Sequence, residues 1–234
     1  MSWCVTYEFV NPLFVSSALA GYPSLGVEFD YDAAGNLIGL RHQLEVASVD
    51  PAEVVRTSER DTRVLFEAIE FVYGLPAQVA TQRAENLGSA EDVTTGFASI
   101  SGGAAIVAPI VFPSEAALAG APTRLAVRLH LSNLARSSAA DSVAVYLYYL
   151  IWEDMRGRPG PADLGTSQER LKFTRDFVSH GEALSNVAAV NFVAAHTVGP
   201  IVAFDPTRDD HVAFVAAQRA EARALIEAEL RGVL

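Results

Sequence analysis

Residues 171–182 read Leu-Lys-Phe-Thr-Arg-Asp-Phe-Val-Ser-His-Gly-Glu. This stretch carries the most informative helix signals of the second half of the chain. Just before this stretch, Thr166 and Glu169 have the spacing of a capping box, which predicts a helix that begins near Ser167. Gly181 is the residue type expected just past a helix C-terminus, because glycine readily adopts the left-handed conformation that satisfies the last carbonyls. The sequence therefore predicts one helix that ends one or two residues before Gly181.

Arg175 occupies a position at which this helix should be apolar. The i, i+3, i+4, i+7 spacing of a core-facing stripe is formed by Leu171, Thr174, Arg175 and Val178. A guanidinium stays protonated at ordinary pH, so a partly buried arginine needs an anionic partner, a carbonyl or a ligand of opposite charge. We therefore expect a specific partner for Arg175.

His180 follows Arg175 by five residues, a spacing that separates two side chains widely around an unbroken helix. The two side chains converge only if the helix unwinds before His180. A histidine at a helix C-terminus lies at the negative end of the macrodipole, which favours imidazolium and suits the ring to proton transfer near neutral pH. His180 is therefore a candidate general acid or base.

The run from Arg175 through Asp176 to His180 resembles the signature of the HEPN superfamily, in which a polar residue and three further residues separate an arginine from a histidine. Asp176 matches the Asn, Asp or His that usually follows the arginine. HEPN proteins are small helical bundles that occur as ribonuclease toxins, phage-defence proteins and nucleotide-binding regulators. The same segment and the overall layout are more weakly similar to methylamine-utilisation MauJ-like proteins.

The HEPN resemblance implies a metal-independent endoribonuclease of toxin or defence type. Arg175 and His180 would act on the RNA phosphate, Asp176 would belong to the same site, and no cofactor would be needed. The cleft would be built from two motifs across a symmetric homodimer, the product would be a 2′,3′-cyclic phosphate, and an antitoxin or regulatory partner could hold the activity silent. Glu153, at the end of a preceding predicted helix, is a candidate orienting partner for Arg175 or His180.

Two other interpretations stay open. In the first, Arg175 simply pairs with a carboxylate such as Glu153, His180 caps the helix, and Glu153 otherwise lies on a solvated helix end. In the second, the bundle is a non-catalytic nucleotide-sensing or protein-interaction module in which Arg175 binds a phosphate.

Composition limits the possible functions. The chain has 234 residues, half of them apolar, and a formal net charge of −11, which argues against broad electrostatic binding of nucleic acid. A single cysteine, Cys4, excludes an internal disulfide and agrees with a reducing cytoplasm, and no spacing of metal ligands is visible. The longest nearly uncharged run, residues 99–113, is too short and too rich in Gly and Pro to span a bilayer, so we expect a cytoplasmic protein.

The sequence predicts an α+β protein with two domains. Residues 1–122 are expected to form a strand-rich domain with one long helix, and residues 123–234 a HEPN-like bundle of about four helices behind a connecting helix. Asp50, Pro51 and Glu53 carry the signals of a helix start, and Gly74 and Pro76 carry the signals of the end of the same helix.

Further elements of both domains follow from alternation, turn and capping signals. The strands are predicted near residues 3–9, 27–32, 37–46, 78–85 and 96–112, and a turn at residues 33–36 joins the second and third strands as a hairpin. The run Ser101-Gly102-Gly103 lies inside the last strand. The later helices are predicted near residues 123–136, 138–152, 185–198 and 205–231; Ser138 and Asp141 have capping-box spacing, and Val198 is expected on the apolar side of the third of these helices. Tyr146, Tyr148 and Tyr149 cannot all face one core, so with Trp152 they are expected to cover either a dimer surface or the first domain.

Overall fold

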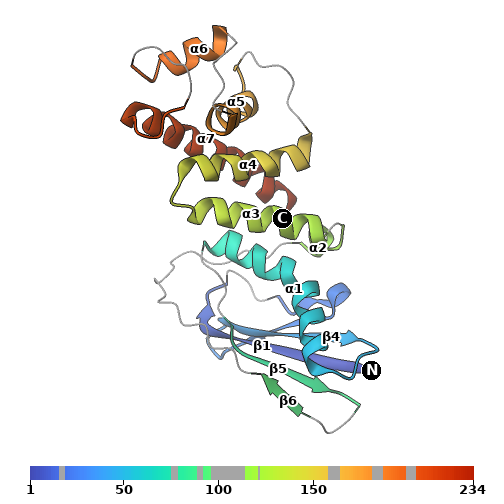
Figure 1. The fold of residues 1–234 in the computed structure, drawn as a ribbon. Helices are drawn as coiled ribbons and strands as arrows, with labels where there is room; N and C mark the ends of the chain where they lie inside the picture. Colours follow the sequence, from blue (N-terminus) through green and yellow to red (C-terminus); the bar gives the residue numbers. More distant parts are fainter. Residues whose placement is uncertain are drawn as a thin grey trace. The chain divides into compact units, whose positions relative to one another are not determined.

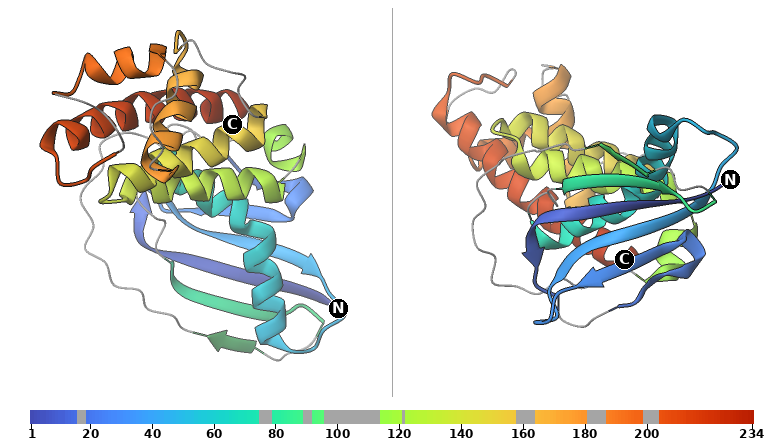
Figure 2. Two further views of the ribbon diagram at one scale, coloured as in Figure 1. Left: turned by 45° about the horizontal axis from the view of Figure 1, so that its top comes forward. Right: turned by 90° about the horizontal axis from the view of Figure 1, so that it is seen from below.

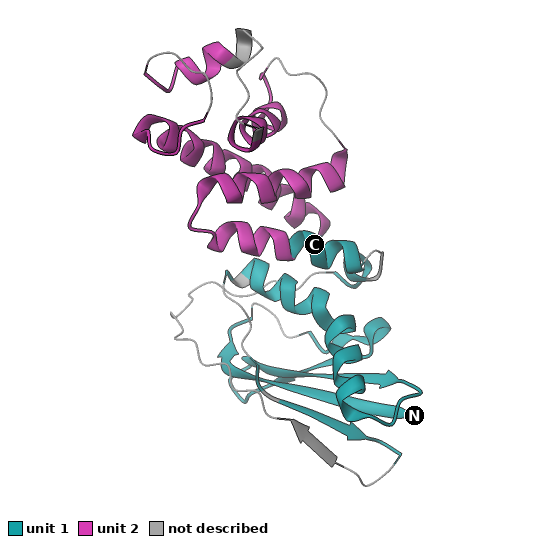
Figure 3. Ribbon diagram, viewed as in Figure 1, with its two compact units in different colours: residues 1–129, 234 teal, residues 130–233 magenta. Residues whose placement is uncertain are grey.

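The computed structural model confirms the α+β class (Figure 1). It describes residues 1–15, 19–74, 79–88, 92–95, 114–120, 122–157, 164–180, 187–198 and 204–234. The chain forms two compact units, residues 1–129 with residue 234, and residues 130–233 (Figure 3). We call them the sheet unit and the helical unit. Helix α3 (Pro122–Ser137) contributes residues 122–129 to the sheet unit and its remainder to the helical unit.

The sheet unit contains an antiparallel sheet in the order β2-β3-β4-β1-β5-β6 (Figure 2). Its strands are β1 (Ser2–Leu13), β2 (Gly21–Tyr22), β3 (Val27–Tyr31), β4 (Leu37–Glu45), β5 (Val79–Asn86) and β6 (Asp92–Thr95). The first strand lies inside the sheet, between β4 and β5. Trp3, Val5, Tyr7 and Phe9 are buried on one face of β1, as the predicted alternation requires.

The predicted hairpin between β3 and β4 is confirmed. Gly35 has a positive φ of 82° in the connecting turn, and its N–H donates to the carbonyl of Asp32. The Asp32 carboxylate accepts N–H groups from Ala34 and Asn36 and the amide of the Asn36 side chain, contacts that lower its pKa. The turn therefore closes through hydrogen bonds between residues a few positions apart, which is why the sequence could predict it.

Helix α1 (Pro51–Tyr73) packs across the sheet and begins and ends as predicted. The Asp50 side chain accepts the N–H of Ala52, and Gly74 closes the helix in the left-handed conformation. The ring of Phe66 meets the rings of Tyr7 and Phe9 edge to face, at centroid distances of 5.3 and 6.3 Å. A short 3-10 turn, η1 (Pro23–Leu25), and helix α2 (Glu115–Gly120) complete the described part of this unit, and Ser24 N–H donates to the Glu115 carboxylate.

The helical unit is a bundle of the end of α3 with α4 (Asp141–Arg156), α5 (Ser167–His180), α6 (Val187–Ala194) and α7 (Asp209–Val233) (Figure 1). Helix α4 packs against both α5 and α7, and α5 also packs against α7. Arg219 of α7 binds the Asp141 carboxylate at 2.7 Å and donates to the carbonyls of Ala135 and Arg136. One arginine thereby holds α7 to the turn between α3 and α4.

Several predicted boundaries are wrong. Helix α4 begins at Asp141 with Ala140 as its N-cap, because the Ser138 hydroxyl binds the main chain of Ala140 and does not cap the helix. Helix α7 begins at Asp209 and not at Asp205, whose carboxylate instead accepts hydrogen bonds from Thr207 in a turn.

The helix predicted near residues 185–198 is shorter than expected. Helix α6 ends at Ala194, and Val198, expected on its apolar side, is 80% exposed. The predicted strand at residues 96–112, with the Ser101-Gly102-Gly103 run inside it, lies outside the described residues.

Candidate functional site

Helix α5 carries the predicted motif and is fixed at its start by the predicted capping box. Glu169 N–H donates to Thr166 Oγ1 at 3.3 Å, and Thr166 N–H donates to Glu169 Oε2 at 3.0 Å. The hydrogen bonds from Thr166 are the main cause of a lowered pKa for Glu169. The capping box is therefore confirmed.

Arg170 ties the first turns of α5 to α7. Its guanidinium forms a bidentate pair with the Glu221 carboxylate and also donates to the hydroxyl of Ser167 and the carbonyl of Leu164. The hydrogen bonds from Arg170 are the main cause of a lowered pKa for Glu221. These contacts fix the rotation of α5 about its axis and thereby the directions of the later motif positions.

The buried stripe of α5 consists of Leu171, Thr174 and Phe177, so it differs from the predicted stripe at its end. Thr174 is fully buried, and its hydroxyl is satisfied there because it donates to the carbonyl of Arg170. The Arg175 side chain, next to this stripe, is only 18% exposed. The expectation that Arg175 is partly buried is correct.

Contacts with Tyr149 and Asp176 help to hold the Arg175 guanidinium in place. Its central carbon lies 4.0 Å from the centroid of the Tyr149 ring on α4, a cation–π contact with a tyrosine that is 2% exposed. Its Nη1 lies 2.9 Å from Oδ1 of Asp176. Arg175 thus has the anionic partner expected for a partly buried arginine, and this partner is Asp176, the next residue of the motif.

Glu153 lies on α4, one helical turn after Tyr149, and is partly exposed. Positions four apart share one side of a helix, so Glu153 is on the side of α4 that carries Tyr149. Its main-chain carbonyl accepts the N–H of Gly157, which ends the helix. The structure therefore brings Arg175, Asp176 and Tyr149 into contact and sets Glu153 on the same side of α4 as Tyr149.

His180 is the last residue of α5, and its side chain lies outside the described part of the structure. The helix continues without a break from position 175 to position 180, so these positions point about 140° apart around its axis. Between these two directions lie positions 172, 176 and 179, which carry a lysine, an aspartate and an exposed serine. We call Lys172, Asp176 and Ser179 the polar face of α5.

Tyr149 is the contact that reasoning from sequence missed. Tyr148, Tyr149 and Trp152 are buried, and among the three tyrosines only Tyr146 is exposed. The spacing of the tyrosines showed that they face different ways, but not that one of them would lie beneath Arg175. The buried hydroxyl of Tyr149 has no hydrogen-bond partner among the described residues.

Aromatic rings and two histidines pack behind α5, and this cluster was not foreseen. It contains Phe173, Phe177, Phe192, Phe204, Phe214, His196 and His211, with neighbouring centroids 5.3–6.3 Å apart. His211 is buried, and its Nδ1 accepts the N–H of Asp205 at 3.0 Å. His196 Nδ1 lies 2.8 Å from the carbonyl of Phe192. Both rings are thus packed in the cluster and bonded to the main chain, while the buried Nε2 of His211 has no hydrogen-bond partner among the described residues.

Neither a metal site nor a membrane-spanning helix is found among the described residues. No cluster of three or more His, Cys, Asp or Glu side chains is placed there to hold a metal ion. Among the same residues, no helix combines the length and the apolar composition that crossing a bilayer requires.

Comparisons with known proteins give no family. No protein-family model matches the chain, and neither the curated proteins nor the solved structures contain a match.

Proposed function

We propose that the helical unit is a HEPN-like, metal-independent endoribonuclease of toxin or defence type that acts as a homodimer. The observation that carries this proposal is the fixed position of Arg175, whose guanidinium is held by the Tyr149 ring and the Asp176 carboxylate beside the polar face of α5. The motif to which Arg175 belongs ends at His180, on the same helix.

The chemistry needs a guanidinium, proton-transfer groups and the substrate's own nucleophile. The ribose 2′-hydroxyl attacks the adjacent phosphorus while an imidazole removes its proton. The bond from phosphorus to the 5′-oxygen breaks, and that oxygen receives a proton from a second acid, which leaves a 2′,3′-cyclic phosphate and a 5′-hydroxyl. Arg175 would stabilise the charge that grows on the phosphoryl oxygens. His180 would be the proton-transfer group.

A second copy completes the site in this proposal. Positions 175 and 180 lie about 140° apart around the axis of α5, a spacing that favours a site to which two copies contribute. A two-fold axis beside the polar face would bring an arginine and a histidine from each copy around one RNA strand. The two imidazoles would then serve as base and acid.

Cleavage of RNA in EDTA by the purified protein tests the proposal. We expect His180→Ala to lower the rate by about 10²–10⁴-fold. We expect Arg175→Lys, which keeps the charge but loses the planar fork, to lower it by at least about 10²-fold. A labelled oligonucleotide followed to its 2′,3′-cyclic phosphate end measures both rates.

Two matched variants serve as controls. Arg223→Ala removes an arginine that pairs with Glu227 along α7, and His196→Gln removes a histidine of the aromatic cluster; both should retain the wild-type rate. Circular dichroism melting of each variant separates lost folding from lost chemistry. Absence of cleavage at every protein concentration, or equal cleavage by wild type, His180→Ala and Arg175→Lys, would remove the enzyme proposal.

The second candidate is a non-catalytic nucleotide-sensing or protein-interaction module. It is favoured by the net charge of −11, which opposes the binding of a long RNA more than that of a single nucleotide or a protein. This candidate predicts saturable binding of a nucleotide, weakened by Arg175→Lys, without RNA cleavage. If the protein is instead a toxin restrained by an antitoxin, expression of wild type alone should slow growth, and expression of His180→Ala should not.

A further inference from the structure

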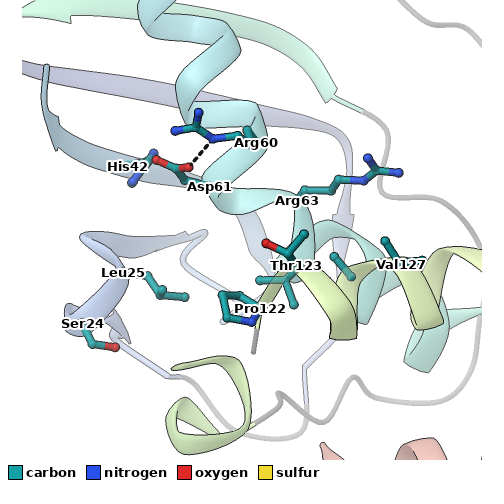
Figure 4. A pocket seen from close by; sticks show the side chains of 11 residues that line it. Ser24, Leu25, His42, Arg60, Asp61, Arg63, Pro122, Thr123 and Val127 are labelled. Atoms are coloured by element: carbon teal, nitrogen blue, oxygen red, sulfur yellow. Dashed lines mark hydrogen bonds and ion pairs between the residues drawn. The ribbon is translucent and has the colours of Figure 1, made fainter. Parts of the chain in front are cut away.

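The sheet unit contains a pocket of about 400 Å³, within the size range of small-molecule sites. Its walls come from η1, β4, α1 and the first turns of α3 (Figure 4). The lining residues include Leu25, His42, Arg60, Asp61, Arg63 and Val127. All of them belong to the sheet unit.

One side of the pocket is apolar. Leu25 and Val64 face it from η1 and α1, and Pro122, Ala126 and Val127 contribute the surface of α3. Apolar surface of this kind favours a ligand with a hydrocarbon or aromatic body, because burying that body removes it from water. The body of the ligand is therefore expected against α3 and η1.

Two arginines with exposed side chains belong to the polar part of the lining, and their guanidinium groups point away from each other. Arg60 and Arg63 come from successive turns of α1, and Asp61 is the one carboxylate among the lining residues (Figure 4). Arg60 Nε lies 2.9 Å from Asp61 Oδ1, whereas Arg63 Nε is 3.7 Å from the Glu67 carboxylate, which does not line the pocket. Asp61 therefore neutralises Arg60 at close range, whereas the carboxylate partner of Arg63 lies farther away and outside the lining, which makes Arg63 the cation best placed to meet a ligand.

His42 forms a fixed, neutral part of the wall. It is 4% exposed, and its Nδ1 lies 2.8 Å from the Ser58 hydroxyl, which accepts a hydrogen bond from Tyr7 at 2.7 Å. Since Tyr7 supplies the proton in that bond, Ser58 can direct its own proton to His42 Nδ1. Burial lowers the pKa of His42, although the nearby Asp61 carboxylate and the Leu25 carbonyl oppose the shift. The ring therefore adds a rigid polar surface without adding charge.

From this arrangement we propose that the pocket binds a small organic anion with an apolar body and an oxyanion head. The body lies against Leu25, Ala126 and Val127, and the carboxylate or phosphate head lies at Arg63. The first turn of α3, at Pro122 and Thr123, adds the positive end of a helix dipole to the same lining. This site is independent of the proposed ribonuclease motif.

Isothermal titration calorimetry of the full chain tests the pocket with phenyl phosphate, benzoate and the neutral benzamide. We expect saturable binding of at least one anion, at least tenfold tighter than benzamide. The preferred anion identifies the head group: phenyl phosphate indicates a phosphate ligand, and benzoate indicates a carboxylate ligand. Equal affinity for the anions and benzamide, or no saturable binding of any of the three, would overturn the proposal.

Three variants locate the binding. Arg63→Gln should weaken the anion at least fivefold, and Val127→Trp should block the pocket from an exposed position of α3. Arg223→Gln, far from the pocket in sequence and on the exposed surface of α7, should bind as wild type does. Unchanged affinity in both Arg63→Gln and Val127→Trp would show that the anion binds elsewhere and would also overturn the proposal.

Discussion

Arg175 shows how one side chain can be partly buried and keep its charge. A cation–π contact contributes about 0.5–2 kcal/mol, depending on how far water is excluded, and a partly exposed ion pair contributes about 0–1 kcal/mol. The Tyr149 ring and the Asp176 carboxylate supply these two contacts. Together they hold the guanidinium in one place, which is what transition-state stabilisation by a fixed charge requires.

At the same scale, His42 predicts a pH dependence of folding. Its pKa in the folded protein is lowered by burial, so the unfolded chain binds more protons below its ordinary pKa of about 6.5. The stability contributed by the neutral ring is therefore complete above about pH 6.5 and is lost as the pH falls. The free energy of unfolding should decrease between pH 7 and pH 5.5, by at most about 1.4 kcal/mol per pH unit from this group.

Urea titrations at a series of pH values measure this effect. In His42→Gln the decrease over the same interval should be smaller, because the variant has no group there to protonate. His196→Gln, which alters a more exposed ring, should keep the wild-type dependence. If the free energy of unfolding of His42→Gln fell with pH as steeply as that of wild type, protonation of His42 would not be the cause of the decrease.

At the scale of elements, the orientation of α5 depends on its connection to α7. Arg170 reaches Glu221 across the two helices, whereas Arg223 and Glu227 pair within α7 alone. Loss of the Glu221 carboxylate removes the ionic partner of the partly buried Arg170 guanidinium. Loss of the Glu227 carboxylate removes its ion pair with Arg223, four residues earlier on the same helix.

Replacing these two carboxylates separately gives a matched comparison. We expect Glu221→Ala to lower the free energy of unfolding by about 1–2 kcal/mol and Glu227→Ala by less than about 0.5 kcal/mol. Chemical denaturation of both variants measures the difference. Equal losses would show that the Arg170 network does not hold α5 against α7.

At the scale of the whole molecule, the net charge of −11 restricts how RNA could bind. A broad basic surface would neutralise many phosphates, and each one steepens the dependence of affinity on salt. In the proposed dimer, the cations near the site are Arg175 and Lys172 of each copy. Binding should therefore depend on salt only moderately.

Fluorescence anisotropy with His180→Ala and a labelled single-stranded RNA in EDTA measures this dependence. Four neutralised phosphates correspond to a slope of log affinity against log salt of about −3, and we expect that value or a shallower one. A slope steeper than about −5 would indicate a wider RNA contact surface than the motif provides. This prediction rests on the proposed function.

Local signals in the sequence were sufficient for much of the fold. The Asp50 cap of α1, the turn at Gly35 and the capping box of Thr166 and Glu169 are all correct, because each depends on residues a few positions apart. The same reasoning failed at Ser138, whose hydroxyl has a competing main-chain partner at Ala140 that spacing does not reveal.

The sequence by itself determined the α+β class, the hairpin, the ends of α1 and the partial burial of Arg175, since periodicity and caps are properties of neighbouring residues. Only the tertiary structure decided that Tyr149 lies beneath Arg175, and that Ser58 joins Tyr7 to His42. The pocket likewise required η1, β4, α1 and α3 to meet. These contacts join segments that are distant in the chain. The same local pattern of apolar and polar residues is compatible with many such pairings, and only the packing of the folded chain selects one of them.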